Sequence, residues 1–178
     1  MLIMTTVETG AAPSASPVRP TLPQALLVLV ALIVAMAGYI ALSAVFGLTE
    51  SYIGFLFVFS WLGLEQGKAE RLPSVVLGAC YGLALCWALQ YLAALNYPPF
   101  LMALYLAAIL FSILCLMMGW LGLLINMPAM LVLTVCTIPH IQQGANFPHL
   151  YLALVFSALY FAALVLGQAK LSARLKRR

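Results

Sequence analysis

Eight polar side chains lie in or beside two short apolar segments, residues 52–64 and 128–141, where they could bind a polar solute. They are Glu50, Tyr52, Ser60, Glu65, Thr134, Thr137, His140 and Gln143. Carboxylate, hydroxyl, imidazole and amide groups can all form hydrogen bonds with a solute. Ionisable groups near the apolar part of a membrane segment are functional candidates by default. We therefore predict that these eight residues line a solute pathway.

Three of the eight also have a simpler structural explanation, and both explanations stay open. Glu65 precedes Lys68 and Arg71 in a charged turn and can form an ion pair there. Glu50 stands where a helix is expected to begin, and an acid or a cap is favourable at that place. His140 lies at the end of an apolar segment, where an imidazole can face the membrane interface.

Other kinds of chemistry find little support in the sequence. Cys136 and His140 are four residues apart and share a helix face, with His149 beyond the next turn, but a metal site needs three or four ligands. No nucleophile elbow is present, and no buried acid is placed to orient a histidine. We predict no enzyme, no metal and no cofactor.

The four cysteines lie in apolar runs and behave as small hydrophobic residues: Cys80, Cys86, Cys115 and Cys136.

The composition predicts the environment in which these residues work. The chain has 178 residues, of which 66% are hydrophobic and 7% charged. Water-soluble domains carry roughly 25% charged residues, so this chain is expected to be an integral membrane protein whose main partner is the lipid bilayer. The apolar runs are unbroken rather than alternating, which favours helices over a barrel. The net charge of +4 is no signal for nucleic acid, and we predict no such partner.

An all-α fold with six transmembrane helices follows from the apolar runs. The expected helices are 24–48, 52–64, 72–95, 99–125, 128–141 and 148–170. About 20 residues are needed to span a bilayer, so the second and fifth helices are short. Residues 1–23 are predicted to be a flexible tail without the features of a cleaved signal peptide. Residues 24–170 form the membrane domain, and 171–178 a basic tail.

Two similar passages suggest that the membrane domain is a repeat. The stretch "WLGLEQGKAERLP" follows the second helix, and "TIPHIQQGANFPHL" covers the end of the fifth; an offset of 77 residues aligns Gln66-Gly67 with Gln143-Gly144. Three crossings is an odd number, so the second three-helix unit must be inverted relative to the first. Chance similarity between two turns remains the alternative.

Basic residues predict the orientation of the chain. They are Arg19, Lys68, Arg71, Lys170, Arg174, Lys176, Arg177 and Arg178. With six crossings and both termini in the cytoplasm, all eight lie on the cytoplasmic side, as the positive-inside rule requires. We therefore expect a multi-pass protein of the cell's inner membrane.

A stripe of small residues on the third helix predicts close helix packing. Ser74, Gly78, Gly82 and Cys86 recur at every fourth position, and such stripes let helix backbones approach closely in lipid. The partner helix is either in the same chain, which we favour, or in another subunit.

The stretches "SYIGFLFVFSWLGLEQGKAERLPSVVLGACYGLALCWAL" and "MPAMLVLTVCTIPHIQQGANFPHLYLALVFSALYF" resemble a small bacterial inner-membrane family known only as domain of unknown function 1097. The likeness covers Gly47 to about Gly167. The chain departs from it in a turn with less glycine and in having His140 and His149. More distantly, Arg71 with the start of the third helix is similar to the membrane half of the fusaric-acid-resistance and aromatic-acid exporters, although the large cytoplasmic domain of those exporters is missing.

The sequence is compatible with two functions. The first is a transporter or channel for a small organic solute, built from two inverted halves and assembled as a homo-oligomer because six helices make a thin bundle. This is also the function that the exporter resemblance implies. The second is a structural or accessory subunit of a membrane complex that docks through its small-residue faces.

Overall fold

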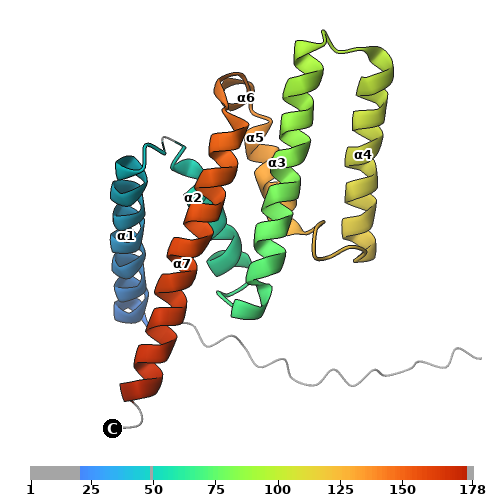
Figure 1. The fold of residues 1–178 in the computed structure, drawn as a ribbon. Helices are drawn as coiled ribbons and strands as arrows, with labels where there is room; N and C mark the ends of the chain where they lie inside the picture. The colour runs from blue at the N-terminus through green and yellow to red at the C-terminus, as the bar shows by residue number, and fades with distance from the viewer. Residues whose placement is uncertain (1–20, 49, 176–178) are drawn as a thin grey trace, which may run out of the picture. The chain divides into compact units, whose positions relative to one another are not determined.

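The computed structural model describes residues 21–48 and 50–175, except for the side chains of Gln24, His140 and residues 169–175. Figure 1 shows the helices. They are α1 (Leu22–Val45), α2 (Tyr52–Val58) continued by a π-helical segment (Phe59–Leu64), a 3-10 turn (Ala69–Arg71), α3 (Leu72–Ala94), α4 (Pro99–Met118), α5 (Met127–Cys136), α6 (Pro139–Gly144) and α7 (Phe147–Leu175).

Four of these helical stretches are long and apolar enough to cross a membrane. They are Ala25–Val45, Ala69–Ala94, Pro99–Met118 and Phe147–Gln168. Two shorter apolar helices accompany them, Tyr52–Leu64 and Met127–Cys136. The protein is therefore a membrane-embedded helical protein, and its second and fifth apolar segments are the short ones.

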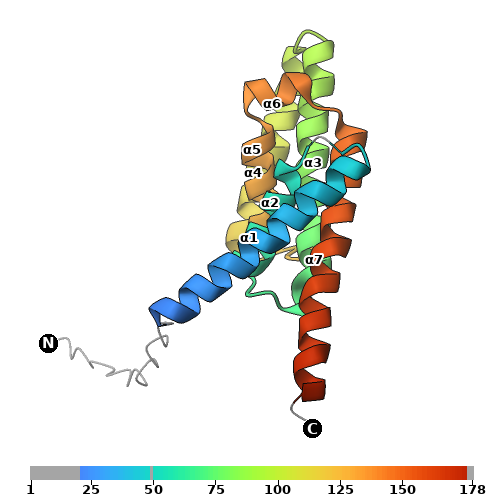
Figure 2. The ribbon, with the colours of Figure 1, turned by 90° about the vertical axis from the view of Figure 1, so that its left-hand side faces the viewer.

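The chain contacts divide at Ala35 and Met36 into two units. The second unit begins within α1 and contains every contact described below. In this unit α3 packs most extensively against α5, α7 packs against α2 and α3, and α4 lies beside α3. Figures 1 and 2 show that α2 and α5 run in opposite directions. The turn after α2 lies at one end of the bundle, and α6 lies at the other end.

Small residues allow α3 and α5 to pack closely. A Cβ on Gly82 would lie 2.5 Å from the carbonyl oxygen of Ala129 and 3.2 Å from the backbone nitrogen of Leu133. The neighbouring Gly78 faces the side chain of Asn126, which precedes α5. The partner of the small-residue stripe, left open by the sequence, is therefore α5 of the same chain.

Two helices end earlier than the sequence predicts. The fourth was expected to continue to residue 125, but α4 ends at Met118 because Gly119 adopts a left-handed conformation with φ 68°. The fifth was expected to continue to residue 141, but α5 ends at Cys136 and α6 begins at Pro139. Proline lacks the N–H that a continuous helix needs at that position. The last helix, in contrast, extends to Leu175.

The first and second halves of the chain begin their helices at nearly constant intervals. Pro99 of α4 lies 77 residues after Leu22 of α1, while α5 and α7 each begin 75 residues after α2 and α3. The two Gln-Gly pairs, however, differ in conformation. Gln66 and Gly67 have φ values of 54° and 67°, whereas Gln143 and Gly144 lie in the helical turn of α6. The spacing of the helices is repeated, but this turn is not.

Candidate functional site

The charged turn after α2 is held by structural interactions. The Trp61 side chain is fully buried, and its indole N–H donates to the carbonyl oxygen of Lys68 at 3.0 Å. The Glu65 carboxylate pairs with the Arg71 guanidinium at 3.7 Å, and the two side chains are 30% and 61% exposed. The turn uses Glu65 as one half of a surface ion pair, which is the simpler of the two explanations that the sequence left open.

Three predicted hydroxyl groups are satisfied within their own helices. Ser60, which is buried, donates to Leu56 O at 2.7 Å. Thr134 is exposed on α5 and donates to Met130 O at 2.7 Å, and Thr137 donates to Thr134 O at 2.9 Å. A hydroxyl that donates to the preceding turn stays compatible with an apolar environment. The structure brings none of these three hydroxyls to a shared polar site.

Four predicted residues lie near the other end of the bundle, around the start of α2 and α6. Gln143 is exposed on α6, and the side chain of His140 lies outside the described residues. Tyr52, the first residue of α2, is half-buried. Glu50 makes no side-chain cap: the N-cap of α2 is Ser51, without a side-chain hydrogen bond.

A buried amide network that the sequence did not predict joins α3 to α6. Gln142 is only 9% exposed, and its Nε2 donates to the carbonyl oxygen of Cys86 at 2.8 Å. From α3, the Gln90 Nε2 donates to the carbonyl oxygens of Gln142 and Ala145 at 3.2 and 3.1 Å. Both amide nitrogens therefore satisfy backbone carbonyls around the break between α5 and α7.

Cys86 lies at the centre of this polar region. Its thiol donates to Leu133 O at 3.5 Å, and its side chain interacts with that of Cys136; both cysteines are buried. Groups from α3, α5 and α6 therefore come together around Cys86.

Three buried oxygen atoms, each on a different part of the fold, have no hydrogen-bond partner among the described residues. They are Glu50 Oε2 just before α2, Tyr105 Oη of α4 and Gln142 Oε1 of α6. A buried polar atom without a partner costs about 1–3 kcal/mol, so such atoms need an explanation.

A fourth such atom, the hydroxyl oxygen of Tyr39, lies elsewhere in the second unit. The Tyr39 ring packs over Gly54 of α2 and against Phe156, Tyr160 and Phe161 of α7, with centroids 5.4–6.0 Å apart. These contacts make Tyr39 part of the aromatic packing that joins α1, α2 and α7.

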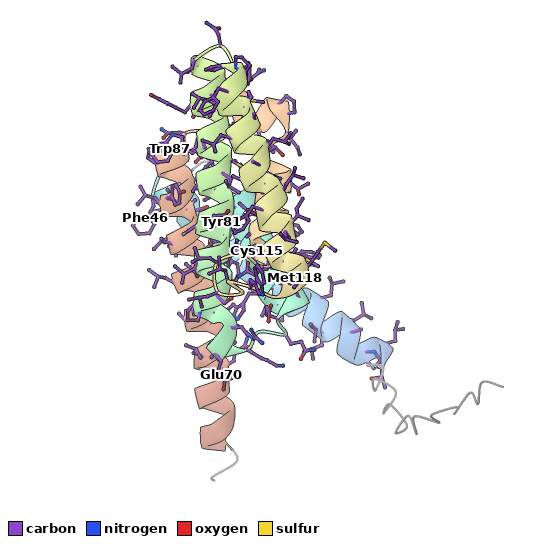
Figure 3. The ribbon with its side chains drawn as sticks, turned by 90° about the vertical axis from the view of Figure 1, so that its right-hand side faces the viewer. Phe46, Glu70, Tyr81, Trp87, Cys115 and Met118 are labelled. Carbon is purple, nitrogen blue, oxygen red and sulfur yellow. The ribbon has the colours of Figure 1, made fainter. Side chains whose placement is uncertain are left out.

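The remaining features of the second unit offer little polar chemistry. Tyr81 of α3 hydrogen-bonds Ser112 of α4 at 2.7 Å, and Figure 3 shows Tyr81 and Cys115 where these two helices lie together. A hollow of about 330 Å³ on α3 is lined by Ala84, Trp87, Ala88 and Tyr91. Within the described residues, no group of three or more His, Cys, Asp or Glu side chains could hold a metal ion.

The predicted solute pathway stays a prediction. The buried Gln142 and Gln90 were not among its eight residues. The available signals were the amide of Gln90 inside an apolar helix and the first glutamine of the Gln142-Gln143 pair. None of the protein families, curated proteins or solved structures compared with the chain matches it.

Proposed function

We propose that the protein is a multi-pass inner-membrane transporter or channel for a small organic solute. In this proposal the chain crosses the membrane six times as two inverted three-helix halves. The resemblance to domain of unknown function 1097 and to the exporters is part of the same proposal. The observation that carries it is the break between α5 and α6, beside which the buried side chain of Gln142 has an oxygen without a hydrogen-bond partner among the described residues.

The arrangement of the short helices supports a transport site. Solute sites of membrane transporters lie where interrupted helices from inverted halves meet near α-helix ends. Here α2 passes into a π-helix, and α5 breaks before Pro139. The two run in opposite directions (Figure 1). Beside the break before Pro139, Gln142 of α6 reaches α3 and keeps one oxygen without a partner among the described residues.

The distribution of charge supports the orientation that we propose. The turn after α2, which contains Lys68 and Arg71, lies at the end of the bundle toward which α7 runs (Figure 1). The last five basic residues of the sequence lie in the final turns of α7 or follow it. Placing this end in the cytoplasm follows the positive-inside rule. Glu50 and α6 then face the outside.

The alternative is an accessory subunit that docks on another membrane protein through its small-residue faces. One of these faces, that of Gly78 and Gly82, is occupied by Asn126 and α5 of the same chain, so we favour the transport proposal. A homo-oligomer remains part of the transport proposal, since the outward surfaces of α3 and α4 carry many exposed apolar side chains.

The proposal is tested by solute flux into proteoliposomes. Purified protein is reconstituted, and the uptake of radiolabelled methylammonium, urea, glycerol and acetate is compared with that of empty liposomes. We expect at least one solute to enter faster with protein present. The variant Gln142→Met should reduce that flux, because it removes the buried amide oxygen that has no partner while keeping side-chain volume.

Gln143→Met is the matched control, since Gln143 lies on the same short helix but is exposed. It should leave the flux unchanged. Protein that passes none of the four solutes, or a flux that Gln142→Met leaves intact, would remove the support for transport through this site.

A further inference from the structure

We propose that α6 is a gate at the outer end of the bundle, held closed by amide hydrogen bonds to α3 and able to open as a unit. This inference deepens the proposed function and rests on it for the statement that the opening admits a solute. The attachment of α6 to α3 does not depend on that function, because it consists of hydrogen bonds and burial that the structure describes.

A single face of α3 carries the attachments of both α5 and α6. The glycines of this face lie against Asn126 and α5. Farther along the helix, the face reaches α6 through the side chain of Gln90 and the carbonyl oxygen of Cys86. Helix α5 is therefore packed against α3, whereas α6 is hydrogen-bonded to it. The face consists of residues four apart, which lie one above the other on a helix: Ser74, Gly78, Gly82, Cys86 and Gln90.

Three hydrogen bonds, given by two amide side chains in opposite directions, attach α6 to α3. From α3, Gln90 Nε2 donates to the carbonyl oxygens of Gln142 and Ala145 at 3.2 and 3.1 Å. From α6, Gln142 Nε2 donates to the carbonyl oxygen of Cys86 at 2.8 Å. The last carbonyl groups of a helix have no partner within it, so Gln90 supplies hydrogen bonds that α6 cannot make by itself. We call these three hydrogen bonds the amide clasp.

Apolar burial contributes little to holding α6 in place. Gln142 is the only buried side chain among the described side chains of this helix, while Ile141 is half-buried and Pro139 and Gln143 are exposed. A helix of six residues is not stable by itself in water. Segments with few buried apolar contacts open more readily than the core of a protein. The amide clasp is therefore the main attachment of α6 that the structure describes.

The backbone on both sides of α6 allows it to move without its neighbours. Ile138 before the helix and Ala145 after it have extended ψ values of 125°. Pro139 has no N–H to continue the hydrogen bonds of α5, and α7 is anchored by the buried side chains of Phe147 and Leu150. Hinges are a few residues at the ends of elements that absorb changes in φ and ψ. Residues 138 and 145 occupy such positions.

Opening of α6 would uncover the oxygen that the closed position leaves without a partner. Gln142 Oε1 is buried and has no hydrogen-bond partner among the described residues. A buried acceptor without a partner disfavours the closed position, whereas the amide clasp favours it. The same residue therefore helps to hold the gate and presents a polar oxygen when the gate opens.

Hydrogen–deuterium exchange of the full chain in lipid nanodiscs measures the opening, because amides exchange with water when a segment detaches. Gln90→Leu removes the donor of two clasp bonds, keeps a side chain of similar size and leaves Gln142 Oε1 in place. It should speed the exchange of residues 141–145 about tenfold, since each lost hydrogen bond favours the closed position by a factor of about 2–12. Exchange along α4 should stay as in the wild type.

Gln143→Leu is the matched control, because it makes the same change at an exposed position of α6. It should leave the exchange of residues 141–145 unchanged. Unchanged exchange in Gln90→Leu would overturn the gate, and so would an equal rise in α4, which would show loosening of the whole bundle. If Gln90→Leu does not insert into membranes, the wild type decides. Its residues 141–145 must exchange faster than the neighbouring turns of α5 and α7, and equal protection would overturn the proposal.

Flux into proteoliposomes separates the gate from the proposed transport. Gln90→Leu should raise the flux, because it eases opening and keeps the oxygen of Gln142. Faster exchange without flux of any solute would leave α6 as a moving helix and remove the proposed transport. Flux with unchanged exchange in Gln90→Leu would retain transport and remove the gate. Faster exchange with an unchanged flux would show that the movement of α6 does not control solute entry, and this too would overturn the gate.

Discussion

The side-chain amide of Asn126 lies in the space where any residue larger than glycine at position 78 would carry its Cβ. Asn126 Oδ1 accepts the N–H of Ala129 at 3.1 Å and so caps the start of α5. Its Nδ2 donates to the carbonyl oxygen of Ser74 at 2.7 Å. One side chain therefore begins α5 and fastens it to α3, and this is possible because residue 78 has no side chain.

Replacing Gly78 with alanine should destabilise the protein by about 2–4 kcal/mol. Overpacking of a filled site costs about 1–3 kcal/mol, and displacement of the Asn126 cap adds about 1 kcal/mol. The measurement is the midpoint of SDS-induced unfolding in mixed micelles. Gly167→Ala on α7, where a Cβ meets nothing within 4 Å, is the control and should unfold as the wild type does. Equal midpoints for both variants would contradict the packing.

The two functions of Asn126 can be separated by two substitutions. Asn126→Ser keeps an oxygen that can cap α5 but is too short to reach Ser74, so about 1 kcal/mol should be lost. Asn126→Ala loses the cap as well, and about 2–3 kcal/mol should be lost in total. The same unfolding midpoint measures both. Identical losses would mean that the cap contributes nothing, and an unchanged midpoint in Asn126→Ser would mean that the contact with α3 contributes nothing.

Oxidation should join α3 and α5 through Cys86 and Cys136. Their side chains interact in the structure, and Gly82 brings the two helices together one turn away. Treatment with diamide, a membrane-permeant thiol oxidant, should form an intramolecular disulfide that protects two thiols from later alkylation. The protection should disappear in Cys86→Ser and Cys136→Ser and persist in Cys80→Ser and Cys115→Ser. Protection lost in either of the last two variants would show a different pairing.

The positions of the helices could largely be predicted because each is an unbroken apolar run between turn residues. The early ends of α4 and α5 are decided by single residues: Gly119 takes a left-handed conformation, and Pro139 starts a new helix. Hydropathy does not register the break at Gly119, since the residues on both sides of it are apolar. The breaks were therefore visible in the sequence only as glycine and proline.

The residues of the candidate site were harder to predict, for a different physical reason. Gln142 and Gln143 are adjacent and chemically identical, yet one is buried and the other exposed. Which one points inward depends on the direction of α6, and that direction is set by the backbone carbonyls that Gln90 binds. Thr134 is polar but satisfied within its own helix. The polarity of a residue therefore does not show whether its side chain is buried, exposed or already hydrogen-bonded within its own helix.

Glu65→Gln should change stability by less than about 1 kcal/mol. Its ion pair with Arg71 is partly exposed at 3.7 Å, and exposed pairs contribute about 0–1 kcal/mol because water screens them. The unfolding midpoint at low and high salt measures the effect. Trp61→Phe in the same turn should cost more, about 1 kcal/mol, because it removes a hydrogen bond from a buried indole to Lys68 O. A larger loss in Glu65→Gln than in Trp61→Phe would reverse this order.

The inverted arrangement predicts that the two polar turns face opposite sides of the membrane. Lys68→Cys and Gln143→Cys introduce exposed thiols into these turns, while the four native cysteines are buried or half-buried. A membrane-impermeant maleimide added to intact cells should label Gln143→Cys and leave Lys68→Cys unlabelled until the membrane is permeabilised. The wild type measures background labelling. We expect the turn with Lys68 to face the cytoplasm because basic residues stay on the cytoplasmic side of the membrane. Labelling of both variants in intact cells would place α6 and the charged turn on one side, and the two halves would then not be inverted.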